Sequence, residues 1–164
     1  MKTEIGNIVI MPLDKDIYGV SRIVNIVNDT CLFELFVSDV FKNETHFNVK
    51  KLILGKKIYI WGYNDYMKEK KWKINGNYND DLEIQMPYYI HRSFYSEEPM
   101  ERFYIQKGDY NNPAHGIGEK KEISEQDIDI LNKNGIISNG IAFPETVIWT
   151  FLKHLEYNNV IKVI

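Results

Sequence analysis

The chain has 164 residues, of which 44% are hydrophobic and 26% are charged, and its formal net charge at pH 7 is −3. These values are ordinary for one globular domain with a real hydrophobic core. Among the 20 basic residues the arginines are Arg22, Arg92 and Arg102. Specific recognition of phosphates and bases favours the planar fork of arginine, so this composition disfavours nucleic-acid binding.

The cysteine count and the first residues bear on the cellular compartment. The lone cysteine, Cys31, lies in an apolar run and cannot form an internal disulfide. This favours a reducing compartment and a buried thiol rather than a reactive one. Residues 1–4 have neither the apolar core nor the cleavage site of a signal peptide, and no apolar stretch is long enough to span a bilayer. We therefore expect a cytoplasmic protein without membrane association.

The first half of the chain is patterned like β-strands. Runs at 5–13, 18–27 and 31–36 are joined by short polar turns and predict an antiparallel meander rather than a nucleotide-binding βαβ unit. Further strand candidates lie at 52–54, 57–61, 72–74, 86–90 and 102–105. Asn75-Gly76-Asn77 predicts a turn. Pro87 predicts that its run is an edge strand or a strand beginning at Tyr88.

The last third of the chain predicts helices. Residues 107–118 are rich in Gly, Asp, Asn and Pro and predict a long loop. Ser124 can cap a following helix, Asp127 stands at the reciprocal position, and Asn134-Gly135 provides a stop. A second helix is expected near Pro144. Its expected apolar stripe comprises Ile148, Phe151, Leu152 and Leu155.

Strands followed by helices predict one α+β domain spanning residues 1–164. We expect mainly antiparallel β structure in the first two-thirds, as a strongly bent sheet or a small barrel. Two helices should pack near the C-terminus. The alternation of apolar and polar residues at 160–164 predicts a final strand.

No residue pattern predicts catalysis, a metal site or a bound cofactor. The four histidines, His46, His91, His115 and His154, lack the helical i, i+4 spacing of zinc ligands. The serines lie in no nucleophile motif. Residues 116–121 begin like a phosphate-binding turn but lack its third glycine, which favours a plain connection. Residues 68–73 place Trp72 among lysines, a pattern that a surface binding single-stranded nucleic acid can use. A solvated hairpin whose tryptophan turns inward is favoured, because the chain is acidic overall.

Acidic clusters near aromatic residues predict a surface for a protein partner. A run of charge is usually just solvated surface, but an acidic cluster can also speed and select the approach of a basic partner, with aromatic side chains as anchors. The residues that we expect to bind a partner are Asp80, Asp81, Glu83, Tyr88, Tyr95, Glu97 and Glu98.

Four motifs occur in a characteristic order. A strand opens with glycine and closes with Pro-Leu at Gly6–Leu13, and a Tyr-Gly strand runs through Tyr18–Val24. A Trp-x-Ile-x-Gly-Asn segment follows at Trp72–Asn77, and a proline with aromatics follows at Met86–Tyr89. This ordered set, covering about residues 4 to 90, resembles immunity protein family 26 of bacterial polymorphic toxin systems.

The resemblance implies a function in binding rather than in catalysis. A member of this family would bind a toxin made by its own cell or a sister cell and inhibit it stoichiometrically, with no enzymatic activity and no cofactor. Gly6, Pro12 and Gly19 would shape turns and edges and Trp72 would fill the core. The motifs contain no residue that contacts a toxin.

Two other functions remain open from the sequence. A small barrel enzyme acting on RNA would recruit dispersed residues such as Arg22, Glu34, His46 and His91. A general peptide-binding or protein-binding adaptor would use an exposed sheet edge.

Overall fold

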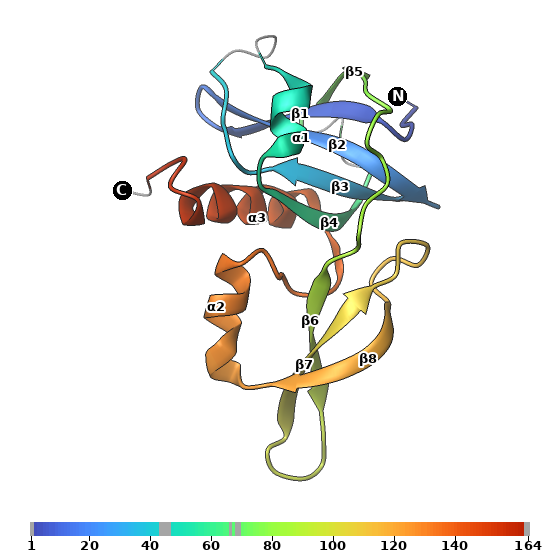
Figure 1. The fold of residues 1–164 in the computed structure, drawn as a ribbon, viewed down its shortest axis with the longest axis vertical. Helices are drawn as coiled ribbons and strands as arrows, with labels where there is room; N and C mark the ends of the chain where they lie inside the picture. Colours follow the sequence, from blue (N-terminus) through green and yellow to red (C-terminus); the bar gives the residue numbers. More distant parts are fainter. Residues whose placement is uncertain (1, 43–46, 66, 68–69, 163–164) are drawn as a thin grey trace. The chain divides into compact units, whose positions relative to one another are not determined.

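The computed structural model describes residues 2–42, 47–65, 67 and 70–162 (Figure 1). Contacts between residues divide the chain into two compact units. Unit 1 contains Met1–Ile84 and Ile141–Ile164, and unit 2 contains Gln85–Gly140. Along the sequence, unit 2 is therefore one continuous segment, and the two segments of unit 1 precede and follow it. No helix among the described residues is long and apolar enough to cross a membrane.

Unit 1 is built on a six-stranded sheet in the order β5-β1-β2-β3-β4-β9. Its strands are β1 (Asn7–Asp14), β2 (Ile17–Val27), β3 (Thr30–Phe36), β4 (Lys57–Tyr63), β5 (Lys73–Asn77) and β9 (Ile141–Ala142). The strands from β1 to β4 form an antiparallel meander, and β5 joins β1 antiparallel. The expected meander is confirmed, as are antiparallel β structure and the α+β class.

The sheet of unit 1 is open, and neither sheet of the described chain is closed or strongly curled. The expectation of a strongly bent sheet or small barrel is therefore wrong. Closure would require the two edge strands to pair with each other, but β5 pairs only with β1. The other edge strand, β9, has two residues, Ile141 and Ala142, and runs parallel to β4.

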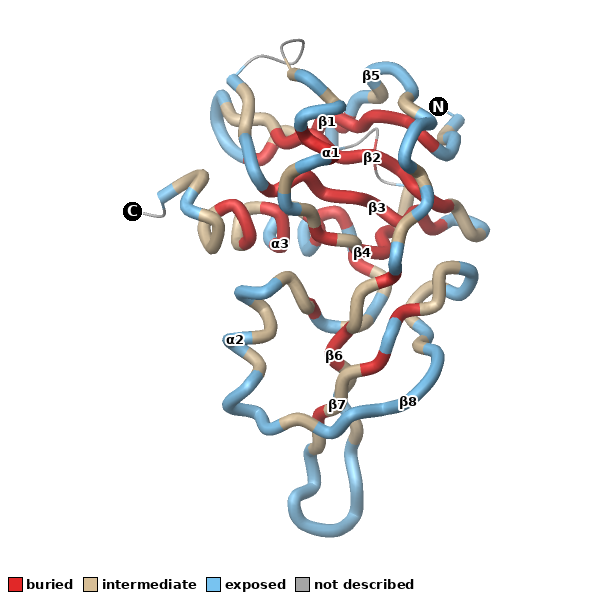
Figure 2. The backbone as a smooth tube through the Cα atoms, in the orientation of Figure 1, coloured by how far each residue is buried: buried red, intermediate tan, exposed pale blue. Residues whose placement is uncertain are grey.

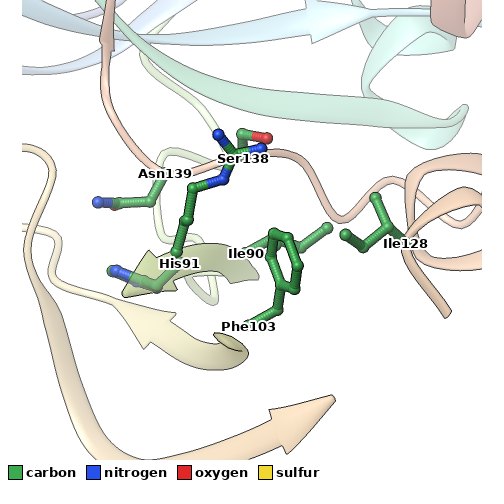
Figure 3. Close-up of a pocket in the computed structure, with 7 residues that line it drawn as sticks. Ile90, His91, Phe103, Ile128, Ser138 and Asn139 are labelled. Atoms are coloured by element: carbon green, nitrogen blue, oxygen red, sulfur yellow. The ribbon is translucent and has the colours of Figure 1, made fainter. Parts of the chain in front are cut away.

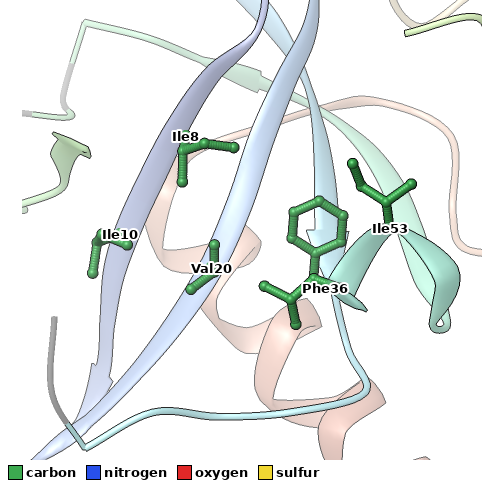
Figure 4. Packing of buried hydrophobic residues seen from close by; sticks show 6 residues of the cluster. Ile8, Ile10, Val20, Phe36 and Ile53 are labelled. Atoms are coloured by element: carbon green, nitrogen blue, oxygen red, sulfur yellow. The ribbon is translucent and has the colours of Figure 1, made fainter. Parts of the chain in front are cut away.

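Both faces of the sheet are covered, which is why β3 and the middle of β2 are buried. All seven residues of β3 are buried (Figure 2). On one face a cluster of buried side chains lies beneath helix α1 (Val49–Leu54) (Figure 4). The members of this cluster are Ile8, Ile10, Val20, Phe36, Leu52 and Ile53. On the opposite face, helix α3 (Pro144–Tyr157) packs against β1 and β4.

Helix α1 replaces the strand expected at 52–54. The Asn48 side chain accepts a hydrogen bond from the backbone N–H of Lys51 and so caps the helix. Leu52 and Ile53 are buried one after the other while Leu54 is exposed, a pattern that suits one side of a short helix. An apolar run this short does not by itself distinguish a helix from a strand.

Helix α3 begins at Pro144 as expected, but its buried face differs from the predicted stripe. Its buried residues are Pro144, Val147, Thr150, Phe151, His154 and Leu155. Ile148 and Leu152 are only half-buried. The predicted stripe omits the polar Thr150 and His154, because it was defined by hydrophobic residues alone. After this helix residues 160–162 form no strand, and residues 163–164 lie outside the described part of the chain.

Unit 2 contains a three-stranded antiparallel sheet in the order β6-β7-β8. Its strands are β6 (Tyr88–Phe94), β7 (Glu101–Gly108) and β8 (Gly116–Ile123). Strand β6 begins at Tyr88 and lies at an edge, as Pro87 predicted. The loop expected at 107–118 spans only 109–115, because β7 continues to Gly108 and β8 starts at Gly116. Residues 116–121 are therefore strand and not a phosphate-binding turn.

The capped helix of unit 2 is confirmed. It consists of a 3-10 turn η1 (Glu125–Asp127) followed by α2 (Ile128–Lys133). Ser124 and Asp127 form the reciprocal capping box that the sequence predicted, and Asn134 closes the helix.

Candidate functional site

Three polar side chains lie in a row across the buried sheet of unit 1. Arg22, Glu34 and Tyr59 are register partners on β2, β3 and β4, so their side chains share one face of the sheet. The Arg22 guanidinium contacts the Glu34 carboxylate at 3.1 Å, and both side chains are almost completely buried. The Tyr59 hydroxyl donates a 2.8 Å hydrogen bond to the other Glu34 oxygen. The buried charges are thus paired and hydrogen-bonded, as burial requires.

The rest of the Arg22 guanidinium holds a surface segment in place. Its Nη1 donates to the carbonyl oxygens of Tyr78 at 3.2 Å and Asp80 at 2.6 Å, and its Nη2 donates to that of Asp81 at 2.8 Å. The guanidinium carbon also lies 5.8 Å from the centre of the Tyr78 ring. One buried cation therefore fixes the backbone from 78 to 81, which belongs to no helix or strand.

This fixed segment presents acidic side chains around an open depression of about 820 Å³. Asp80, Asp81 and Glu83 are exposed and line it, and the basic side chain in the lining is Lys50 of α1. The remaining lining residues are Tyr78, Asn79 and Leu82. Three carboxylates against one ammonium favour a cationic occupant, such as a lysine or arginine side chain of a protein.

In unit 2 three of the predicted residues lie together at the turn of the β6–β7 hairpin. Tyr95, Glu97 and Glu98 are all exposed there. Tyr88 lies at the opposite end of β6 and is half-buried, with the Lys121 ammonium 5.5 Å from its ring centre. Within unit 1 the structure groups Asp80, Asp81 and Glu83, and within unit 2 it groups Tyr95, Glu97 and Glu98.

The net charge of the chain comes entirely from unit 2. Residues 85–140 hold nine Asp and Glu against six Lys and Arg, whereas the acidic and basic residues of unit 1 are equal in number. The negative potential of the protein is therefore associated with the unit that carries the exposed hairpin turn.

A pocket of about 510 Å³ in unit 2 contains a mixed lining (Figure 3). Its apolar residues are Ile90, Phe103 and Ile128, and its polar residues are His91, Arg92, Ser138 and Asn139. The Arg92 guanidinium is already paired with Glu101 at 2.7 Å and lies over the Phe103 ring. The arginine of this lining therefore already has a carboxylate partner.

His91 is the histidine of this pocket, and its ring is stacked on Tyr104 with a centroid separation of 4.8 Å. Its buried Nε2 atom has no hydrogen-bond partner among the described residues. Burial, together with the charge of Lys120, lowers the pKa of His91, because both disfavour the imidazolium form. Its arrangement is that of a neutral stacked ring.

Two of the residues considered for an enzyme acting on RNA, Arg22 and Glu34, are buried in the sheet of unit 1 and bind each other. His91 belongs to unit 2. His46 lies outside the described residues. Cys31 is fully buried, so the prediction of a buried thiol is confirmed, and burial raises the pKa of this thiol to about 11.

The other two described histidines lie in helix α3 and in the loop before β8. His154 is buried in α3, where its Nδ1–H donates to the carbonyl oxygen of Thr150 at 3.0 Å. His115 is exposed in the loop before β8. Among the described residues no group of three or more His, Cys, Asp or Glu side chains could hold a metal ion.

Two positioning arginines were missed from the sequence. Arg22 orders the acidic segment of unit 1, and Arg102 covers Tyr95 with its guanidinium carbon 4.2 Å from the ring centre. For Arg22, the sequence does contain a signal of a buried ion pair, because one arginine and one glutamate lie in neighbouring apolar strands.

No known protein family, curated protein or solved structure matches this chain.

Proposed function

We propose that this chain is an immunity protein that binds a cognate bacterial toxin and neutralises it by stoichiometric inhibition in the cytoplasm. It works through complementary surfaces and performs no chemistry. The ordered motifs that resemble immunity protein family 26 give the class of function.

The motif residues support this proposal because they serve the scaffold and leave the surface free for a partner. Gly6 has a φ of +94° just before β1, a conformation that favours glycine. Trp72 is 2% exposed and meets Phe33 edge to face, with ring centroids 5.7 Å apart. Gly19 lies inside β2, where Phe151 of α3 packs against it, rather than at a turn.

The observation that carries the proposal is the acidic depression of unit 1. Its carboxylates stand on a backbone that the buried Arg22 holds through three hydrogen bonds. A surface fixed before binding costs little conformational entropy to use, which suits a tight and slowly dissociating inhibitor. The excess of negative charge would speed the approach of a basic partner.

The test is co-expression with the toxic domain encoded by the gene beside the gene of this chain. Cells should survive the toxin only when this chain is present, and the purified proteins should form a 1:1 complex. Survival without this chain, or no complex at micromolar concentrations, would refute the proposal.

The depression is tested with Asp80→Lys/Glu83→Lys, both exposed residues of its rim. We expect Kd to rise by about 30-fold or more, the size of a typical hot spot. The matched control is Asp29→Lys/Asp39→Lys, which reverses two exposed charges elsewhere in unit 1 and should leave Kd within about 3-fold.

A further inference from the structure

The turn of the β6–β7 hairpin projects beyond the third strand of its sheet. Strand β8 pairs with β7 only between Phe103 and Gly108, whereas β6 and β7 pair as far as Phe94 and Glu101. Residues 94–102, here called the finger, therefore extend beyond the part of the hairpin that pairs with β8. Figure 2 shows this loop exposed along its length.

The finger exposes three large side chains with apolar surface. Phe94 is 71% exposed, Tyr95 is 48% exposed and Met100 is 56% exposed. Single exposed apolar residues need no explanation, but three within one hairpin turn form a patch of the kind that marks an interaction site. Aromatic residues and methionine are also enriched at protein interfaces.

The finger is held in one conformation by its own contacts. The backbone N–H of Tyr95 donates to the carbonyl oxygen of Met100 at 2.6 Å, and Arg102 Nε donates to that of Pro99 at 3.3 Å. The Arg102 guanidinium also covers the Tyr95 ring. A turn closed in this way loses little entropy when a partner binds it.

The charges of the finger select the chemistry of its partner. Arg102 is engaged with Tyr95, and Arg92 of the hairpin stem is paired with Glu101. Glu97 and Glu98 are exposed at the turn, and no described side chain pairs with them. The apolar patch is thus bordered by two carboxylates that remain available to cations of another molecule.

We propose that the finger inserts into a basic cleft of the toxin, with Phe94 and Met100 on the apolar floor and Glu97 and Glu98 facing lysine or arginine side chains of the walls. This inference rests on the proposed function and names the part of this chain that enters the partner. A second copy of this chain is a poor occupant, because unit 2 is itself acidic and would bring like charges together.

The test measures binding of the toxic domain from the neighbouring gene to two finger variants of the full chain. Glu97→Lys/Glu98→Lys should slow association by about 10-fold and flatten the salt dependence of Kd. Phe94→Ser/Met100→Ser should speed dissociation and raise Kd by about 30-fold or more.

Matched controls come from exposed positions of the same unit outside the finger. Glu119→Lys/Glu122→Lys reverses two charges on β8, and Ile130→Ser removes an apolar side chain that is 62% exposed on α2. Both should dissociate like the parent chain, and the β8 variant should slow association less than Glu97→Lys/Glu98→Lys does, because its charges lie outside the finger. Circular dichroism and thermal unfolding of each variant establish that its fold is retained, and the two finger variants alter different chemistry, so a folding defect in one leaves the other as the test.

The outcomes separate this inference from the proposed function. If the parent chain binds and protects and both finger variants do the same, the finger is not the binding element, although the immunity function stands. If the parent chain does not bind the toxic domain, both proposals fail. Self-association of the parent chain that the finger variants abolish would also overturn the inference, because the occupant would then be a second copy.

Discussion

Arg22 connects the interior of unit 1 to its surface. Its side chain is completely buried, yet its hydrogen-bond acceptors include three backbone carbonyls of an exposed segment. A lysine could not replace it, because a single ammonium cannot meet Glu34 and three carbonyl oxygens in a planar arrangement. The position of the acidic side chains is therefore decided by a residue that no partner can touch.

We expect Arg22→Met to lower the free energy of unfolding by about 3–5 kcal/mol, because Glu34 would stay buried without its partner. Urea denaturation followed by tryptophan fluorescence measures the change. Arg22→Met/Glu34→Leu should be more stable than the single variant, since it removes the unpaired charge. If the double variant were no more stable, the ion pair would not account for the loss.

The buried thiol of Cys31 predicts a specific alkaline instability. Its pKa rises from an ordinary 9.0 to about 11 because burial disfavours the thiolate. Well below pH 9 the thiol is protonated in both states and adds no pH dependence. Between pH 9 and about 11 the unfolded chain releases this proton while the native chain keeps it, so stability falls by about 1.4 kcal/mol per pH unit from this group.

The measurement is urea denaturation between pH 8 and pH 11 for the parent chain and Cys31→Ala. Other groups titrate in this range in both proteins, so the difference between the two curves isolates the thiol. The parent chain should lose more stability than the variant. Parallel curves would contradict the assignment of a raised pKa to a buried thiol.

At the residue scale, burial set by the local sequence pattern is predictable, whereas contacts between residues far apart in the sequence are not. Trp72 and Cys31 were expected to be buried, and both are at most 2% exposed. The role of Arg22 could not be foreseen, because the carbonyls that it holds lie 56 to 59 residues further along the chain. The grouping of Tyr95 with Glu97 and Glu98 was predictable, since one hairpin turn contains all three.

At the scale of elements, turns and caps were predicted better than short apolar segments. The capping box at Ser124 and the start of α3 at Pro144 follow from local hydrogen bonding and fixed φ, which tertiary contacts do not change. The turn signal at 75–77 instead lies inside β5, where Gly76 has a φ of +84° at a bulge opposite β1.

Close packing around Gly19 explains why the Tyr-Gly motif contains a glycine. A Cβ atom built there would lie 2.6 Å from the Phe151 ring and 2.9 Å from Leu13, closer than real atoms approach. Gly19→Ala should therefore displace α3 from the sheet and cost about 1–3 kcal/mol of unfolding free energy, measured by thermal denaturation. In combination with Phe151→Leu, which creates space, its cost should shrink. Purely additive costs would show that the two residues do not compete for space.

Ser124→Ala tests the helix of unit 2. Because the capping box supplies partners for backbone N–H groups at the start of η1, its loss should cost about 1 kcal/mol. The helix buries no residue, so the effect should be local and visible as faster hydrogen exchange in residues 125–133. Ser96→Ala, at an exposed position of the finger, should leave this exchange unchanged. Equal exchange in all three proteins would rule out a stabilising cap.

At the scale of the whole molecule, the strand order of unit 1 was partly predictable and the division into two units was not. The meander follows from hairpin turns, but the return of β9 to β4 joins residues separated by all of unit 2. Composition gives no boundary at 84, and Ser138-Asn139-Gly140 predicts only an ordinary turn. The prediction of one domain spanning 1–164 means that the whole chain unfolds cooperatively, which native-state hydrogen exchange can measure.

Unit 2 has a small core, and we expect it to open at a lower free energy than unit 1. Its buried hydrophobic residues are Met86, Tyr89, Ile90, Phe103 and Ile137. Native-state hydrogen exchange should give the amides of β7 a smaller opening free energy than those of β3, which is buried on both faces. Equal values in both strands would instead mean that the chain unfolds as one cooperative domain.

The placement of α3 late in the chain has a consequence for synthesis. Phe151 and Leu155 cover the sheet from a helix that is made after all of β1 to β8. At about 5–20 residues per second, translation leaves a nascent chain with β1 to β5 made and one apolar face of their sheet uncovered for several seconds. A ribosome-bound intermediate of this kind would be a natural client for chaperones, and a chain truncated before Pro144 would be prone to aggregation.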